Sequence, residues 1–282
     1  MRIGVILPSF DADADAARSC AGAAEGAGIH GVFAYDHLWP PGAPGRPAIA
    51  PFPLLGLIAA ETSRVFLGTL VARIGLVPDE ALVSEFRTLS ALSGRRVIAG
   101  IGTGDRRSTA EHLAYGIVPA DAAARRRALG AVGVALVAVG LPVWVGAGSE
   151  ATNAVAREIG ATINVFGSGA EQVAEVGRAG AVCWGGVLAR GARAVAAQLG
   201  GLERAGATWA VVGGPARSDR SSRRRARRAS RSDGEPGRDC GRRPVGSEWS
   251  GRGGSGRWQA PLLTRWALAE RQARQNQSLT AL

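Results

Sequence analysis

Residues able to contact a ligand gather in the stretch Arg95–Asp105, which reads Arg-Arg-Val-Ile-Ala-Gly-Ile-Gly-Thr-Gly-Asp. Its centre is a short apolar run, which is typical of a strand buried on both faces. The glycines that follow allow a sharp turn and let a ligand approach the backbone. Thr103 and Asp105 then lie at the carboxyl end of the strand, where α/β folds place their chemistry. Taken alone, the stretch is explained equally well by a glycine-rich turn that holds no ligand.

Other apolar runs also end in polar or glycine-rich residues. Asp36 and His37 follow the run 31–35, and the turn Gly146–Ser149 follows the run 143–145. A Pro- and Gly-rich loop then continues from His37 through Trp39 to Pro53, because proline is excluded from helix interiors and central strands. A loop of this length at the carboxyl end of a strand is a usual place for a substrate pocket.

The elements that would position these residues alternate along the chain. Apolar runs predict eight strands, over 2–7, 31–35, 65–71, 95–102, 143–145, 161–166, 181–187 and 207–212. Between most of them, helical segments are expected over 13–27, 54–62, 79–92, 121–139, 150–159, 171–178 and 193–205. Strands that alternate with helices favour parallel pairing, and eight such units predict an α/β fold of the (β/α)8 TIM barrel type.

Charge divides the chain into two parts. The formal net charge is +11, and all 34 basic residues are arginine, which we interpret as codon bias in a GC-rich genome. Residues 1–216 hold 18 arginines and 17 acidic residues, whereas residues 217–282 hold 16 arginines and 6 acidic residues. Like charges as dense as those of Arg217–Arg231 repel one another and oppose a packed core.

Two domains are therefore expected, a barrel over 1–215 and a mostly disordered Arg/Ser/Gly-rich tail over 216–282. A barrel of this type has an eighth helix after Pro215, and the sequence there does not predict one. A helix over 261–275 would cover the exposed flank between the eighth and first strands; otherwise apolar surface there would favour a homodimer. A frameshift near Ala216 is an alternative explanation of the abrupt change.

Three cysteines without metal-binding or CxxC spacing favour a reducing, cytoplasmic compartment and no metal. Cys20 is expected to be a core residue. Neither a signal peptide nor an apolar run of membrane-spanning length is evident, so no membrane partner is expected.

Five short motifs occur in the order found in a known family. They are Asp36-His37-Leu38, Leu67-Gly68-Thr69, Leu92-Ser93-Gly94-Arg95-Arg96, Gly100-Ile101-Gly102-Thr103-Gly104 and Trp144-Val145-Gly146-Ala147-Gly148. Together they resemble the bacterial luciferase-like oxidoreductases, especially the branch that uses the deazaflavin coenzyme F420. The resemblance covers residues 1–215. It implies a barrel that binds its coenzyme at the carboxyl ends of the strands and transfers hydride to or from a small organic substrate.

The resemblance also implies roles for individual residues. His37 matches a catalytic general acid or base, and histidine suits proton transfer near neutral pH. Asp36 would orient His37 or cap the following turn, and Trp39 would line the substrate pocket. The remaining cofactor-binding positions are Leu70, Val71, Thr103, Gly104, Asp105, Gly146, Ala147, Gly148 and Ser149. Leu70-Val71 matches a site of a non-prolyl cis peptide, with an ordinary strand as the alternative, and Gly146–Ser149 would offer N–H groups to the coenzyme phosphate.

Alternatives remain open at this point. An FMN-dependent luciferase-like monooxygenase would keep the same fold with a different coenzyme. Clustered arginines in the tail bind phosphates in principle, but the tail lacks interleaved aromatic residues, so nucleic acid is a less favoured partner. A further hypothesis is that the chain is an inactive, truncated homologue of these enzymes. Glu111 is expected to form a structural ion pair with one of Arg125–Arg127, and His30 and His112 are expected to be structural.

Overall fold

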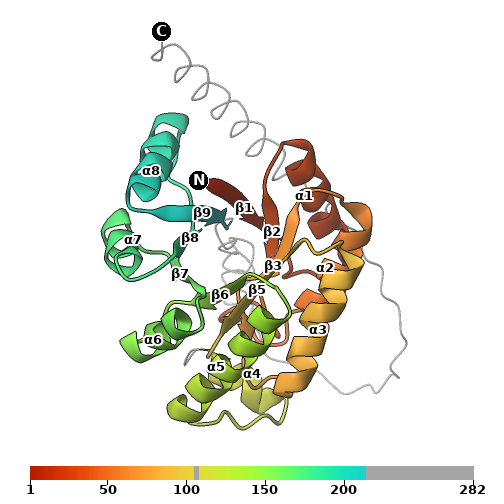
Figure 1. The fold of residues 1–282 in the computed structure, drawn as a ribbon. Coiled ribbons are helices and arrows are strands. Elements are labelled where there is room, and N and C mark those ends of the chain that lie inside the picture. The colour runs from red at the N-terminus through yellow and green to blue at the C-terminus, as the bar shows by residue number, and fades with distance from the viewer. Residues whose placement is uncertain (105–107, 214–282) are drawn as a thin grey trace, which may run out of the picture. The chain divides into compact units, whose positions relative to one another are not determined.

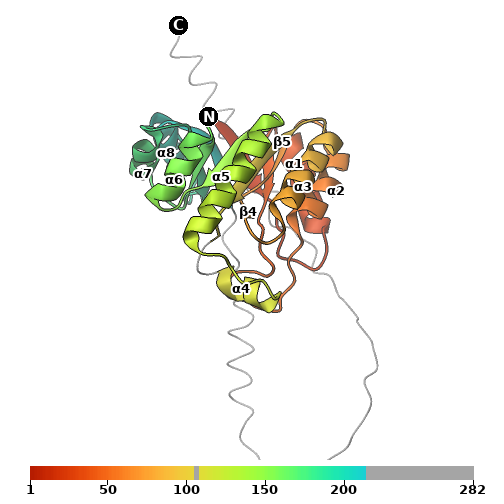
Figure 2. The same cartoon turned by 60° about the horizontal axis from the view of Figure 1, so that its bottom comes forward.

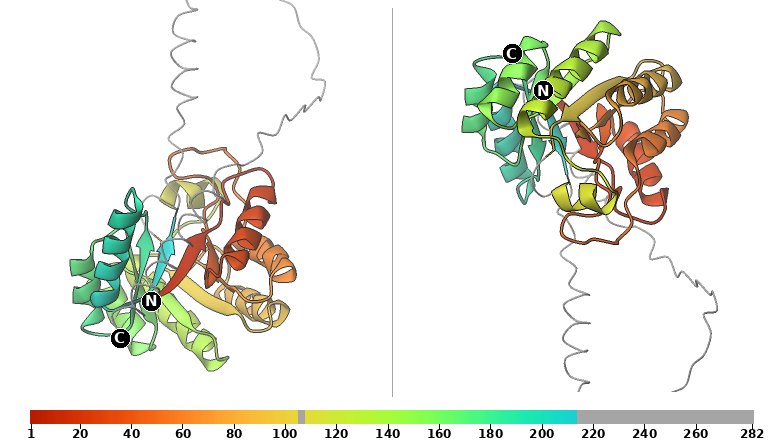
Figure 3. Two further views of the ribbon diagram at one scale, coloured as in Figure 1. Left: turned by 90° about the horizontal axis from the view of Figure 1, so that it is seen from above. Right: turned by 90° about the horizontal axis from the view of Figure 1, so that it is seen from below.

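The computed structural model describes residues 1–104 and 108–213, which form a closed barrel of parallel strands surrounded by helices (Figure 1). The strands are β1 (Arg2–Ile6), β2 (Gly31–Ala34), β3 (Phe66–Thr69), β4 (Ala72–Arg73), β5 (Val97–Gly102), β6 (Val143–Gly146), β7 (Thr162–Phe166), β8 (Val182–Gly186) and β9 (Ala207–Val212). The helices are α1 (Asp15–Gly26), α2 (Pro51–Glu61), α3 (Asp79–Leu92), α4 (Thr109–Ala114), α5 (Ala122–Ala138), α6 (Glu150–Glu158), α7 (Ala170–Gly177) and α8 (Ala192–Arg204). End-on views show the helices on the outside of the ring of strands (Figure 3).

The predicted eight-stranded barrel is confirmed, with one interruption. Strand β9 pairs in parallel with β1 and completes the ring. β3 and β4 both pair with β5, so together they make the third barrel strand. The predicted continuous strand over 65–71 is wrong in one respect, because the chain leaves the ladder after Thr69 and resumes pairing at Ala72. The two residues between, Leu70 and Val71, are joined by a cis peptide bond.

Aromatic side chains fill the inside of the barrel. The rings of Phe33 and Trp144 stack with centroids 5.1 Å apart, and Trp209 packs edge-on against Trp144 at 5.5 Å. Towards the amino ends of the strands, the guanidinium of Arg2 lies over the rings of Trp209 and Phe66, at 5.6 and 5.8 Å. Because this end is filled, the carboxyl ends are the side of the barrel left for a ligand.

The helices lie close to their predicted ranges, with two differences. α2 begins at Pro51, inside the segment predicted to be a loop, because a proline without an N–H group is tolerated in the first turn of a helix. The short helix α4 lies apart from the other helices, beyond the carboxyl ends of the strands (Figure 2). α5 begins as expected after Asp121, whose carboxylate accepts a hydrogen bond of 2.7 Å from the Ala124 N–H.

Several predictions fall on residues outside the described ranges. They concern Asp105, the domain boundary at 215, the tail over 216–282, the helix over 261–275 and the missing eighth helix. In the part that is described, Cys20 is buried in the core as expected, and burial raises the pKa of its thiol to about 12. No helix among the described residues is long and apolar enough to cross a membrane.

Candidate functional site

Asp36 joins the ends of two strands. It follows β2, and its Oδ2 accepts a 2.7 Å hydrogen bond from the backbone N–H of Arg73 in β4. Burial raises the pKa of the Asp36 carboxyl, against the opposing effects of the Arg73 N–H and guanidinium and of His37. The Asp36 carboxylate is thus directed to β4, and its expected role in orienting His37 or capping the following turn stays a prediction.

His37 lies beside Asp36 at the carboxyl end of β2 and is held by Glu111. Its Nδ1 lies 2.8 Å from Glu111 Oε1, and its side chain is 26% exposed. Aromatic rings surround it, with the centroids of Phe10 and Tyr35 at 6.1 and 6.2 Å. His37 is thus fixed at one nitrogen and still reachable from the barrel mouth.

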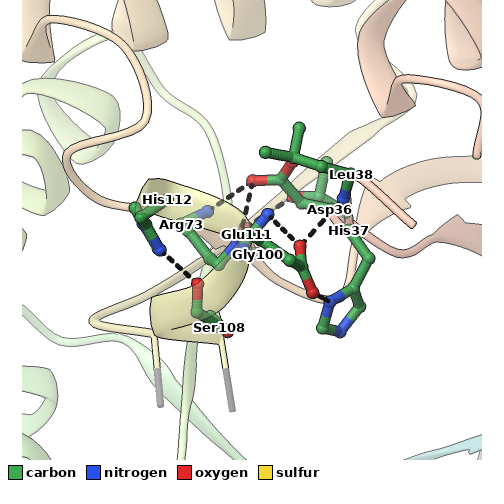
Figure 4. A network of polar contacts seen from close by, with 9 residues as sticks. Asp36, His37, Leu38, Arg73, Gly100, Ser108, Glu111 and His112 are labelled. Atoms are coloured by element: carbon green, nitrogen blue, oxygen red, sulfur yellow. Dashed lines mark hydrogen bonds and ion pairs between the residues drawn. The ribbon is translucent and has the colours of Figure 1, made fainter. Parts of the chain in front are cut away.

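Glu111 and Arg73 form the buried part of this cluster. Their side chains are 3% and 4% exposed, and Glu111 Oε2 lies 3.0 Å from Arg73 Nη2 (Figure 4). The same Oε2 accepts a 2.9 Å hydrogen bond from the Leu38 N–H. The expected ion pair of Glu111 with Arg125–Arg127 is wrong, because Glu111 lies in the first turn of α4 and faces the strand ends, while Arg125 bonds to the Ala120 carbonyl.

Sequence reasoning missed Arg73 as a site residue. The available signal was a charged residue directly after an apolar run, as at Asp36. Nothing in the sequence indicates that Arg73 contacts Glu111 in α4, because this contact depends on the closure of the barrel.

The cis peptide Leu70-Val71 is confirmed, and glycines make room for it. A Cβ atom at Gly102 would lie 2.5 Å from Val71 Cγ2, and one at Gly146 would lie 3.4 Å from it. A Cβ at Gly100 would clash with the Thr69 carbonyl oxygen. The glycines of β5 and β6 therefore make room for the Val71 side chain at the barrel mouth.

The turn Gly146–Ser149 lies at the start of α6, as expected. Ser149 caps that helix by accepting from the Thr152 N–H, the Ala147 N–H donates to the Asn164 carbonyl, and the Gly148 N–H donates to Asn153 Oδ1 at 3.3 Å. Two of the N–H groups predicted to bind a phosphate therefore already have acceptors in the protein. Gly148 borders a hollow of about 400 Å³ between α6 and α7.

Thr103 and Gly104 line a hollow whose lining does not include His37. They line a space of about 440 Å³ whose other polar lining residues include Asp79, His112 and Arg125. His112 is buried and donates from Nδ1 to the Ser108 carbonyl at 2.7 Å, in agreement with a structural role. The structure therefore brings His37, Asp36 and Val71 to the barrel mouth, while Thr103 and Gly104 border the space beneath α4 and α5.

Trp39 connects the loop after β2 to α4. Its ring lies 6.4 Å from that of Tyr115, the residue that ends α4. The contacts of Glu111 with His37 and Leu38 join the same two segments. The role of Trp39 as a wall of the substrate pocket stays a prediction.

Part of the chain is similar to known proteins. Residues 1–130 match the family described as luciferase-like monooxygenase. An 83-residue stretch of this chain is 43% identical to the F420-dependent glucose-6-phosphate dehydrogenase of Beutenbergia cavernae, covering 29% of this chain and 25% of that protein. The match thus spans about a quarter of the length of the curated relatives.

Solved structures resemble the barrel over a larger part of the chain. An F420-dependent secondary alcohol dehydrogenase in complex with an F420-acetone adduct matches with a TM-score of 0.64 and 13% identity, covering 75% of this chain and 92% of that one. A monooxygenase from Streptomyces bottropensis matches with a TM-score of 0.55 and 18% identity, covering 73% and 82%. At such identities the likeness shows the fold alone.

Proposed function

We propose that the luciferase-like barrel is an oxidoreductase that transfers a hydride between the deazaflavin coenzyme F420 and a small organic substrate. The observation that carries the proposal is His37, held at Nδ1 by a buried carboxylate and 26% exposed at the barrel mouth. The 43% identity to an F420-dependent dehydrogenase over 83 residues supports this choice of coenzyme.

The residues at the mouth fit such a coenzyme. Gly100, Gly102 and Gly146 make room for the Val71 side chain at the barrel mouth, which places it where the ring would lie. Arg73 Nη1 is buried and has no hydrogen-bond partner among the described residues, so it is available to donate to a polar group of a ligand.

Each residue then has a proposed task. Leu70 and Val71 would hold the ring, Thr103 and Gly104 would contact its polar part, and Gly146, Ala147, Gly148 and Ser149 would lie near the phosphate. When bound, the coenzyme supplies or accepts the hydride. His37 exchanges the proton with the substrate oxygen, and Phe10 and Tyr35 keep bulk water away from its ring.

The proposal is tested with the purified full chain. Oxidised F420 and FMN are titrated separately under anaerobic conditions, and binding is followed by absorbance and fluorescence. Alcohols, ketones, enones and glucose 6-phosphate are then screened for bleaching or recovery of the coenzyme spectrum. Binding of F420 and substrate-dependent bleaching without oxygen consumption support the proposal, whereas failure to bind F420 contradicts it.

A second candidate is an FMN-dependent monooxygenase. The match of residues 1–130 to the family described as luciferase-like monooxygenase favours it. Selective FMN binding together with substrate-dependent oxygen consumption is the outcome expected of this candidate, and it is distinct from the outcome expected of the first.

A further inference from the structure

The carboxylate of Glu111 contacts three groups, one at Oε1 and two at Oε2. Oε1 lies 2.8 Å from His37 Nδ1, while Oε2 accepts the Leu38 N–H at 2.9 Å and lies 3.0 Å from Arg73 Nη2. The side chain of Glu111 is only 3% exposed, so water does not compete effectively for these oxygens. Glu111 is therefore bound on both sides and has little freedom to rotate.

This arrangement fixes where the His37 proton resides. An amide N–H and a guanidinium are donors only, so both require Glu111 to act as an acceptor. A carboxylate in that state also accepts at Oε1, and Nδ1 of His37 must then carry the hydrogen. Figure 4 shows the other ring nitrogen of His37 turned away from the carboxylate. In the neutral ring that nitrogen, Nε2, has a free lone pair.

We propose that Glu111, supported by Arg73, is the positioning residue of His37: it selects the Nδ1–H tautomer and presents the Nε2 lone pair to the substrate. The catalytic part of this inference rests on the proposed function. A proton leaving a substrate hydroxyl goes to Nε2, and the imidazolium that forms lies 2.8 Å from the Glu111 carboxylate, which stabilises its charge. In the opposite direction Nε2 returns the proton to the substrate oxygen.

The variant Glu111→Gln tests the tautomer directly. The Leu38 N–H donates to Oε2 and Arg73 Nη2 lies 3.0 Å from it, so the amide oxygen of glutamine is expected there. The amide NH₂ then occupies the position of Oε1 and donates to His37 Nδ1, because an amide nitrogen has no lone pair to accept with. The variant should therefore switch His37 to the Nε2–H tautomer while keeping the shape of the side chain.

The chain contains only three histidines, and the other two are internal standards. His112 donates from Nδ1 to a carbonyl oxygen, so its Nδ1 carries hydrogen. His30 accepts the Ile3 N–H at Nδ1, so its hydrogen is on Nε2 when the ring is neutral. Ring ¹⁵N spectra of the labelled full chain, recorded above about pH 8 where histidine is ordinarily neutral, distinguish the two patterns.

In the wild-type protein we expect His37 to show the pattern of His112, and in Glu111→Gln the pattern of His30. The control Glu171→Gln, an exposed change in the first turn of α7, should leave all three patterns unchanged. A wild-type His37 with the His30 pattern overturns the inference, and this result needs no variant. An unchanged His37 pattern in folded Glu111→Gln also overturns it.

Activity gives an independent second readout. In a serine-protease triad, a carboxylate-to-amide change that selects the wrong histidine tautomer lowers kcat about 10⁴-fold. We expect Glu111→Gln to lower kcat by about 10²–10⁴-fold with little change in KM. A switched tautomer with unchanged turnover would overturn the catalytic role of His37, and so the proposed function, while leaving the wild-type tautomer assignment in place.

Discussion

His37 and Glu111 are 74 positions apart in the chain, yet their polar atoms lie 2.8 Å apart. The contact exists because β2 and α4 both deliver residues to the carboxyl side of the barrel. Both carboxylates of the cluster, Asp36 and Glu111, form ion pairs with the guanidinium of Arg73. Removing one member therefore changes the electrostatics of all the others.

His37→Ala should reduce turnover far more than coenzyme binding. A general acid or base contributes about 10²–10⁴-fold in rate, and the Gly-rich surroundings of Val71 stay intact in this variant. The measurement is kcat with a competent substrate beside the dissociation constant of the coenzyme. His30→Gln, at the amino end of β2, is the matched control and should keep wild-type turnover. Full turnover of His37→Ala would show that the proton is exchanged elsewhere.

The raised pKa of Asp36 predicts how the free energy of unfolding changes with pH. Its carboxyl has a raised pKa in the folded state, so the folded state binds more protons than the unfolded state between the ordinary value and the raised one. The wild-type free energy of unfolding is then lowered by Asp36 as pH rises through that interval. Relative to wild type, Asp36→Asn should become more stable as pH increases from about 4.

Asp121→Asn is a control for this pH dependence with the opposite sign. Hydrogen bonds from the first turn of α5 lower the pKa of Asp121, so its ionised form adds stability above the unfolded pKa and loses it as pH falls. Relative to wild type, Asp121→Asn should become less stable as pH rises. Urea unfolding at a series of pH values measures the free energy of unfolding of both variants relative to wild type. If this difference changed with pH in the same direction for both variants, the prediction would be contradicted.

At the scale of elements, the barrel mouth depends on small residues in β5 and β6. Much of this level could be predicted from sequence, since the apolar runs and alanine-rich segments gave most strands and helices within a few residues. The break at Leu70 and Val71 could not be derived from hydrophobicity, because both residues are apolar and fit a strand. Only the resemblance to the family indicated the cis peptide there. The contact of Glu111 with Arg73 was missed because it joins α4 to β4 across the mouth.

Gly102→Ala should destabilise the protein by about 1–3 kcal/mol, because the new Cβ would lie 2.5 Å from a stiff valine side chain. It should also weaken coenzyme binding, since Val71 must move. Gly22→Ala is the matched control: it lies in α1 with no atom within 4 Å of the new Cβ. Because alanine is favoured over glycine in helices, Gly22→Ala should stabilise by about 0.5–1 kcal/mol. The measurement is urea unfolding. If the free energy of unfolding changed in the same direction in both variants, this explanation would be contradicted.

At the scale of the whole barrel, stability and site geometry depend on closure between the first and last strands. β1 meets β9 through a parallel ladder that includes Arg2 opposite Trp209. The aromatic composition of the interior could not be assigned from sequence, because β-strand patterning does not distinguish which face of a fully buried strand turns inward. The closed barrel nevertheless followed from the count of strand and helix units.

Trp209→Ala should lower the free energy of unfolding by about 3–5 kcal/mol, because it removes a buried ring and leaves a cavity. Trp209 is 6% exposed and its ring packs against Phe33, Trp144 and Phe66, so the loss affects three other strands. Val134→Ala on α5, where the valine is 58% exposed, is the matched apolar truncation and should change stability by less than about 0.5 kcal/mol.

Urea unfolding followed by circular dichroism measures both variants. Because Trp209 fills the amino end of the barrel while His37 lies at the carboxyl end, folded Trp209→Ala should still show the wild-type ring ¹⁵N pattern of His37. A loss of stability with an unchanged His37 pattern would show that the interior supports the fold without setting the tautomer. A small loss, comparable to that of Val134→Ala, would mean that the aromatic interior contributes little to closure of the barrel.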